Sequence, residues 1–442
     1  MRVHAGDRAD DDIDDGPGAR IVLALLGAGW VAVLALYLSH SIVLSADSVN
    51  NHVHVWYIAR DLWHHARLPW RMPVLAHGDA YAYPYGFVNW TTAALLWPLF
   101  GNWVVTLWTA VGAVGCILAT FTAFPELRRG WWAAAVLANP AILEGLLFGQ
   151  QSFLWGAMLL LFGVAAWRRG HPAWAAILVG LGQANHAAIV LPMGVLLVLY
   201  YLPFAPDRRV LLRWYALSCA IALPAVWLVF ASPTAEQSTT GSQVTNFFIT
   251  LGPRILIVGL PVICVWVRRT GIRALAPLGV VLALIAHLSF EIPLNVGQQW
   301  SALAHHGTET ASLDAYLRSP AFVPGATYRV LRGGDGKVGL YLVLRAGGDL
   351  DSEMFPESMA IRNFRDVADY ATLLCDRGVD QVIHYDTYDS GRHTNEGEMI
   401  DALEVQATAG VRLRVIAGGT GWKVDAVDRV ACRPHGGATS AE

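Results

Sequence analysis

The chain has 442 residues and a formal net charge of −3; 55% of its residues are hydrophobic and only 15% are charged. Soluble domains are about one quarter charged, so this composition indicates an integral membrane protein with a smaller soluble part. A nearly neutral chain offers no basic surface for nucleic acid, and we expect no nucleic-acid partner.

The N-terminal segment 1–19 is acidic and polar, and it is expected to form a disordered cytoplasmic tail. It lacks the basic start and the small-residue cleavage site of a signal peptide. The apolar run 20–42 is therefore expected to be an uncleaved first membrane span, long enough for about 30 Å of hydrocarbon.

Arginine pairs recur between the following apolar segments and predict the orientation, because positively charged short loops stay on the cytoplasmic side. Residues 43–88 then form a long external loop, two hairpins over 131–167 and 173–203 turn outward, and about nine helices cross the membrane within residues 20–294. The pairs are Arg128–Arg129, Arg168–Arg169, Arg208–Arg209 and Arg268–Arg269. We expect a multi-pass protein of the plasma (inner) membrane.

The segment 295–442 is expected to be an extracytoplasmic α/β domain. Residues 327–346, "TYRVLRGGDGKVGLYLVLRA", predict two strands joined by a Gly-Gly-Asp-Gly turn. Residues 366–378 and 396–409 predict helices, and 379–386, 411–417 and 421–427 predict strands. Cys375 and Cys432 lie in this domain, where oxidation is possible, and the sequence leaves a disulfide between them open. Cys116, Cys219 and Cys264 lie in expected spans as packing residues.

The common catalytic motifs are absent from the sequence. It contains no P-loop, G-x-S-x-G, H-E-x-x-H or C-x-x-C, and "GLGQAN" at 180–185 follows no strand and lies within an apolar hairpin. The absence of these motifs argues against a nucleotide-driven pump and against a hydrolase of the soluble type, and we expect no cofactor.

Polar chemistry gathers instead in the external loop, which opens with Asp47 directly after the first span. That carboxylate is either a solvated helix end or a group in a partly dry interfacial pocket, where its pKa would rise and it could act as a general base. His52 and His54 would diverge by about 200° on a helix and cannot both face one metal ion, so we expect no metal. They, or Arg60 and Arg71, could hold an anionic headgroup.

Aromatic residues of the loop and polar residues at the hairpin tips extend the candidate site. The aromatic residues are expected to form an interfacial belt, and some, Tyr85 among them, could stack on a sugar ring. Polar groups at membrane depth usually face a functional cavity, although they can also cap hairpin turns. The tip residues are Glu144, Gln150 and Gln151 in the first hairpin and Gln183, Asn185 and His186 in the second.

This arrangement resembles the polytopic GT-C glycosyltransferases: a first span, an external aspartate with a nearby histidine, "RLPW" at 67–70 and "HGDAYAYPYG" at 77–86. The tip "PAILEGLLFGQQS" at 140–152 is similar to the Gly-Gln turn of their lipid-phosphomannose-dependent, mannosyltransferase-like branch. The C-terminal "SEMFPES" and "YATLLCDRGVDQVIHYDTYD" are similar to the external domain of uncharacterised bacterial membrane proteins.

The resemblance implies transfer of a sugar from a polyprenyl-phosphate-linked donor to a lipid or glycan acceptor hydroxyl outside the cytoplasm, with inversion. Asp47 would be the catalytic base, and Arg71, His52 or His186 would hold the leaving phosphate. Relatives often carry a second acidic residue beside the aspartate, whereas Ala46 and Ser48 flank Asp47, which argues against a metal-dependent mechanism.

Two alternatives to a transferase stay open at this point. A flippase of a lipid-linked sugar would use the same cavity without a base, but it would need a second polar cluster among the spans. A non-catalytic envelope-assembly scaffold would tolerate loss of Asp47 and depend on residues 325–430.

Overall fold

The computed structural model describes residues 16–42, 48–74, 82–83, 85–230, 254–270, 275–289, 312–331, 336–351, 364–385, 395–419 and 421–430. The described residues form two compact units. The first is helical and contains residues up to 67 and from 83 to 289. The second contains residues 68–74, 82 and those from 312 to 430.

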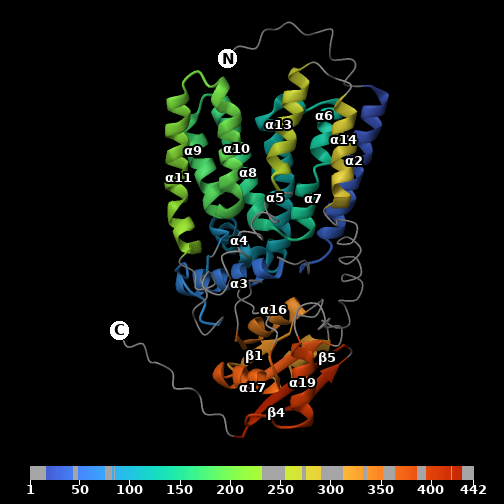
Figure 1. Ribbon diagram of the computed structural model, residues 1–442, viewed down its shortest axis with the longest axis vertical. Helices are drawn as coiled ribbons and strands as arrows, with labels where there is room; N and C mark the ends of the chain where they lie inside the picture. Colours follow the sequence, from blue (N-terminus) through green and yellow to red (C-terminus); the bar gives the residue numbers. More distant parts are fainter. Residues whose placement is uncertain are drawn as a thin grey trace. The chain divides into compact units, whose positions relative to one another are not determined.

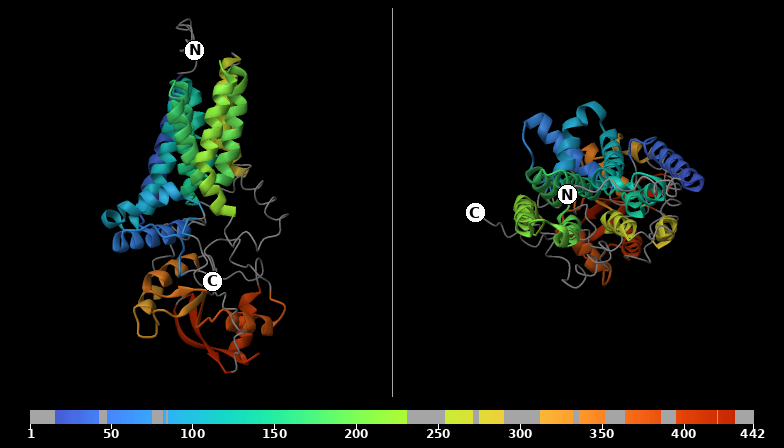
Figure 2. Two further views of the ribbon diagram at one scale, coloured as in Figure 1. Left: turned by 90° about the vertical axis from the view of Figure 1, so that its left-hand side faces the viewer. Right: turned by 90° about the horizontal axis from the view of Figure 1, so that it is seen from above.

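The first unit is a bundle of long helices with one helix, α3, lying crosswise at its end (Figures 1 and 2). Two short 3₁₀ helices, η2 (Pro125–Leu127) and η3 (Leu202–Phe204), join its elements. The α-helices are α2 (Pro17–Tyr37), α3 (Ser48–His65), α4 (Phe87–Phe100), α5 (Trp103–Ala123), α6 (Gly130–Leu137), α7 (Pro140–Leu147), α8 (Gln151–Arg168), α9 (Pro172–Asn185), α10 (Ala187–Tyr201), α11 (Arg208–Phe230), α13 (Leu256–Arg269) and α14 (Leu275–Ser289).

Within the described residues, five helical segments are long and apolar enough to cross a membrane. They are Pro17–Tyr37, Trp103–Ala123, Gly130–Leu147, Ala187–Phe204 and Arg208–Trp227. Large apolar side chains point outward from several helices, as on α11, where Trp227 is 71% exposed. This surface suits lipid, and the chain is a multi-pass membrane protein. The two expected hairpins are present as α6–α7–α8 and α9–α10, and the total of about nine spans stays a prediction.

Helices α8 and α9 approach each other closely because glycines face each other where they meet. A Cβ added to Gly182 would lie 2.6 Å from the carbonyl oxygen of Gly156, and one added to Gly156 would lie 2.7 Å from Val190. Small residues of this kind let helix backbones pack tightly in a membrane. The close contact brings the end of α9 against the start of α8.

The second unit is a five-stranded sheet in the order β2-β1-β3-β5-β4, covered by helices. β1 (Thr327–Val330) is parallel to β2 (Asp349–Leu350) and to β3 (Gln381–Tyr385), whereas β5 (Trp422–Arg429) is antiparallel to β3 and to β4 (Val411–Gly419). The helices are α16 (Gly336–Ala346), α17 (Val367–Asp376) and α19 (Glu396–Val405). Its core includes Tyr370, Leu374, Val382, Ile400 and Leu403.

The structure has the predicted helical part and the predicted C-terminal α/β part, but one predicted strand is wrong. The second half of 327–346 is helix α16. Its buried residues Leu340, Tyr341, Val343 and Leu344 follow a helical rather than an alternating pattern. β1 and β2 are parallel neighbours, which cannot be joined by a hairpin turn and need a crossover such as a helix.

The other elements of this unit agree with the sequence. α17, β3, β4 and β5 lie where predicted, and α19 ends at Val405 rather than 409. Cys375 is disulfide-bonded, while Cys432 lies outside the described residues. Cys116, Cys219 and Cys264 are free, as expected of packing residues. The domain boundaries predicted at 19/20 and 294/295 stay predictions.

Candidate functional site

The first half of the crosswise helix α3 is buried although it is unusually polar. Asn50, Asn51, His52 and His54 are each 2% exposed or less. Burying so many polar groups is costly unless they serve packing networks or a ligand. Asp47, the predicted base, is the residue next to the start of this helix and lies outside the described residues.

Asn51 joins α3 to two other elements. Its Nδ2 donates to the carbonyl oxygen of Gly149 over 2.6 Å, and its Oδ1 accepts from the Trp90 indole N–H over 2.8 Å. Both polar atoms of the amide are thus used. The side chain fixes α3 against α4 and against the turn that precedes α8.

Asn185, at the end of α9, caps a different helix. Its Oδ1 accepts from the backbone N–H groups of Val88 and Asn89 at 3.0 and 3.2 Å, in the first turn of α4. The first N–H groups of a helix have no partner within the helix, so this amide replaces a local cap. Its Nδ2 donates to the Ser152 carbonyl over 2.7 Å. Asn185 therefore joins α4, α8 and α9.

Four rings form a continuous set of contacts across the same region. His54 stacks on Trp90 with centroids 4.3 Å apart and planes 8° apart. Tyr85 lies 5.0 Å from Trp90 and 5.4 Å from His186. Trp90 is fully buried, whereas Trp63 and Trp70 are 55% and 61% exposed. The interfacial-belt prediction therefore suits the last two, but not Trp90.

A buried cation lies beside the Gly149–Gln150 turn. The Arg254 Nε donates to Gln150 Oε1 over 2.9 Å, and its Nη2 lies 3.6 Å from Glu144 Oε1. The side chains of Arg254 and Glu144 are 13% and 10% exposed. Arg254 is also close enough to His186 for its charge to act on the imidazole. A guanidinium held in this way can bind a phosphate with several N–H groups at once.

These contacts bring most of the predicted residues together. His54, Tyr85 and His186 share the ring contacts, Glu144 and Gln150 share Arg254, Asn185 braces the centre, and His52 is buried on α3. Arg71 is exposed and belongs to the second unit, so the predicted substrate-binding set does not lie within one unit.

Arg254 was missed by the sequence analysis, which assigned it to a span. The available signal was a lone arginine within the apolar run after Pro253, without the second basic residue that marks each cytoplasmic loop. An ionisable residue inside a membrane segment is a functional-site hypothesis by default. Asn51 and Asn89, whose Nδ2 donates to Gln151 Oε1 over 2.7 Å, were also missed, because nothing local distinguishes a bridging asparagine from a solvated one.

No protein-family model matches the chain, and no curated protein sequence matches it. Three solved structures are similar. The arabinofuranosyltransferase AftD from Mycobacteria is 15% identical with a TM-score of 0.50, over 92% of this chain and 40% of AftD. ArnT from Cupriavidus metallidurans bound to undecaprenyl phosphate is 15% identical, with a TM-score of 0.48 over 90% of this chain and 97% of ArnT.

The third structure is the oligosaccharyltransferase of Archaeoglobus fulgidus in complex with Zn and sulfate. It is 11% identical, with a TM-score of 0.45 over 92% of this chain and 73% of that protein. The chain spans less than half the length of AftD. At these identities the likeness concerns the fold, and the membrane-embedded part of this chain has the fold of the GT-C glycosyltransferases.

Proposed function

We propose that this protein is a membrane glycosyltransferase that moves a sugar from a polyprenyl-phosphate-linked donor to an acceptor hydroxyl outside the cytoplasm. Such a donor carries its energy in the sugar–phosphate bond, so the reaction needs no nucleotide site. Its tail lies in lipid and its phosphate at the interface, so the reacting groups must also lie at the end of the bundle. The proposal includes the mannosyltransferase-like character that the resemblance of residues 140–152 implies.

The observation that carries the proposal is the largely buried Arg254 in contact with Glu144 and Gln150. A guanidinium held beside a glutamate and an amide is a site in which a phosphate can add to, or replace, the glutamate as the counter-charge. Gln150 follows Gly149, which Asn51 binds, and α3 begins one residue after Asp47. This series of contacts supports a phosphate site and a base belonging to one active site.

The proposed reaction assigns separate roles to these groups. Asp47 takes the proton of the acceptor hydroxyl as its oxygen attacks the anomeric carbon from the face opposite the phosphate. The bond from the anomeric carbon to the phosphate oxygen breaks, the configuration inverts, and polyprenyl phosphate leaves. Arg254, assisted by His186 or His52, stabilises the charge that develops on the leaving phosphate. The ring of Tyr85 supplies an apolar face for the sugar.

A place for the lipid tail is also available in the first unit. An apolar cleft lies among α8, α9, α10 and α11. Gly194 lines this cleft, and a Cβ added there would lie 3.0 Å from both Gln183 and Tyr215. The lining of the cleft includes Trp167, Val179, Leu197, Tyr201, Trp214 and Tyr215.

The test uses the full chain purified in detergent and a panel of radiolabelled polyprenyl-phosphate sugars with membrane-lipid acceptors. Release of polyprenyl phosphate with transfer of label to an acceptor supports the proposal. Donor binding without release, combined with movement of the donor across proteoliposome membranes, would establish the flippase alternative. A protein that binds none of the donors would be a scaffold.

A further inference from the structure

A second polar cluster lies in the sheet of the second unit and belongs to no role described above. In the register of β3 and β5, His384 is opposite Lys423, and Val382 is opposite Asp425. Residues opposite each other, or diagonal by two, project from the same face of a sheet. His384, Lys423 and Asp425 therefore share one face.

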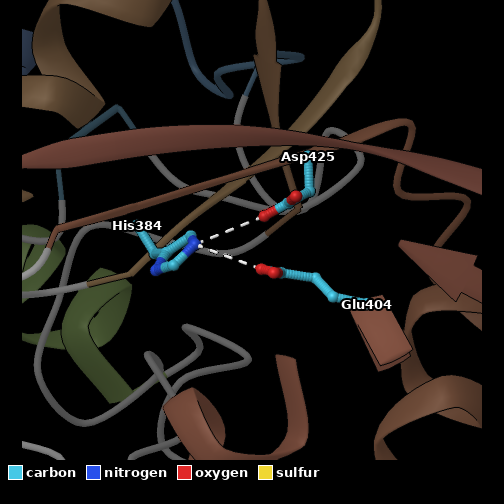
Figure 3. A group of neighbouring side chains, drawn as sticks. All are labelled: His384, Glu404 and Asp425. Atoms are coloured by element: carbon cyan, nitrogen blue, oxygen red, sulfur yellow. Dashed lines mark ion pairs between the residues drawn. The ribbon is translucent and has the colours of Figure 1, made fainter. Parts of the chain in front are cut away.

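Helix α19 covers that face and supplies Glu404 (Figure 3). The His384 Nε2 is 3.3 Å from Asp425 Oδ2 and 3.9 Å from Glu404 Oε1. One donor atom from each of the three side chains lies within 4.8 Å of the other two. One imidazole and two carboxylates therefore converge on one point from two strands and a helix.

Asp425 is the unusual member of the cluster. The residue is fully buried, and neither carboxylate oxygen has a hydrogen-bond partner among the described residues. The His384 Nε2, although only 3.3 Å away, does not form a hydrogen bond with it. A buried carboxylate that accepts no hydrogen bond is costly, and in proteins such groups are paired or coordinate metals.

The spacing of the donor atoms suits a metal ion. Zn²⁺ binds imidazole nitrogen and carboxylate oxygen at about 2.0–2.2 Å, which places two ligands of a tetrahedral site about 3.3–3.5 Å apart. The His384–Asp425 separation already has that value. Glu404 needs only a small shift, and its side chain is long and 22% exposed.

Lys423 accounts for the present position of Glu404. Its ammonium contacts the Glu404 carboxylate and lies 3.6 Å from Asp401, whose side chain is 74% exposed. If a metal ion took Glu404, the ammonium could pair with Asp401 instead. Lys423 is therefore a competitor for Glu404 rather than a ligand.

We propose that His384, Glu404 and Asp425 form a binding site for one divalent transition-metal ion, such as Zn²⁺, in the soluble unit. A mixed imidazole–carboxylate set favours Zn²⁺ over Mg²⁺ and Ca²⁺, which prefer oxygen ligands alone. An ion there would connect β3, β5 and α19 and neutralise the buried Asp425. The site stands apart from the proposed transferase reaction, and its test does not depend on activity.

The test is titration of the full chain, purified in detergent and stripped with chelator, with Zn²⁺ alone. Calorimetry should give one saturable site that Mg²⁺ does not fill, and the thermal midpoint of unfolding should rise with Zn²⁺. Asp425→Asn and His384→Gln should each weaken Zn²⁺ binding by about tenfold to hundredfold or more. That range is the cost of losing a residue that only hydrogen-bonds to a metal ligand, and losing a ligand itself should cost at least as much. Glu398→Gln, at an exposed position of the same helix, should leave the affinity unchanged, and Lys423→Met should raise it severalfold.

Three results would overturn the proposal. One is a folded wild-type chain that binds no Zn²⁺, which would make the cluster an ion-pair network around Lys423. Another is saturable binding that persists unchanged in His384→Gln, which would place the ion elsewhere on the chain. The last is weaker Zn²⁺ binding in Lys423→Met. If Asp425→Asn fails to fold, His384→Gln and Glu404→Gln decide the question.

Discussion

Replacing Arg254 with methionine should affect stability and donor binding by separable mechanisms. The variant leaves Glu144 as a carboxylate that is 10% exposed and has lost its counter-charge. Breaking a buried ion pair from one side costs about 3–5 kcal/mol of the free energy of unfolding. The second substitution Glu144→Gln removes the carboxylate charge that Arg254 balances, so the double variant should recover most of that loss.

Donor affinity should not recover in the double variant. A hydrogen bond to a charged group contributes about 1.5–3 kcal/mol, equivalent to about 10–150-fold in the dissociation constant. Arg254→Met should weaken polyprenyl-phosphate binding by this factor with or without Glu144→Gln. The single variant Glu144→Gln should bind the phosphate more tightly than wild type, because the guanidinium no longer has a competing carboxylate.

The assay combines thermal unfolding in detergent with equilibrium binding of radiolabelled polyprenyl phosphate, for wild type, both single variants and the double variant. Arg254→Lys is the matched control, since it keeps the charge but loses the planar fork, and it should give intermediate affinity. Wild-type affinity in the double variant would refute the reasoning, because Arg254 would then serve only to neutralise Glu144.

Three further predictions concern the supports of the two units. Asn185→Ala removes the cap of α4 and the hydrogen-bond donor to the Ser152 carbonyl, so it should lower the free energy of unfolding by about 2–3 kcal/mol. Thermal unfolding measures this loss, and an unchanged unfolding midpoint would contradict the capping role. Gly86→Ala should also lower the unfolding midpoint and weaken donor binding, because the φ of Gly86 is +76° and the new Cβ would lie 2.6 Å from the Ser152 Oγ. Gly27→Ala is the control: a Cβ at Gly27 would have nothing within 4 Å, so the midpoint and the donor affinity should stay unchanged. Arg329→Met should cost about 3–5 kcal/mol, because it removes the cation that pairs with the buried Asp351 and Glu396. Arg414→Met at an exposed pair should cost at most about 1 kcal/mol, and equal effects of the two would contradict the burial argument.

The membrane architecture was predictable because lipid imposes strong rules on sequence. Long apolar runs and arginine pairs predicted the first span and both hairpins, and the structure has helices there. In the second unit, the periodicity of apolar residues identified α17, β3, β4 and β5. It failed at α16, where the Gly-rich segment before the helix was taken for a hairpin turn although the apolar spacing was helical.

Many residues of the candidate site could be predicted from the sequence, but the contacts between them could not. Glu144, Gln150, Asn185 and His186 were selected as polar groups at membrane depth, and each takes part in the contacts described above. Their partners could not be named, because Arg254 reaches Gln150 and Glu144, and the first turn of α4 reaches Asn185, from elements far away in the sequence. The cluster of His384, Glu404 and Asp425 was missed for the same reason, since it depends on the register of β3 with β5.

The central claim is that Asp47 is the base of a sugar transfer, and the most direct test is the rate of polyprenyl-phosphate release per bound donor. The wild-type chain and Asp47→Asn are compared in one preparation, with Asp61→Asn, an acid paired with Arg67 at the other end of α3, as the control. The account predicts that Asp47→Asn binds donor normally and is slower by about 10²–10⁴-fold, the range for general-base catalysis, while Asp61→Asn keeps the wild-type rate. An unchanged rate per bound donor in Asp47→Asn would contradict it.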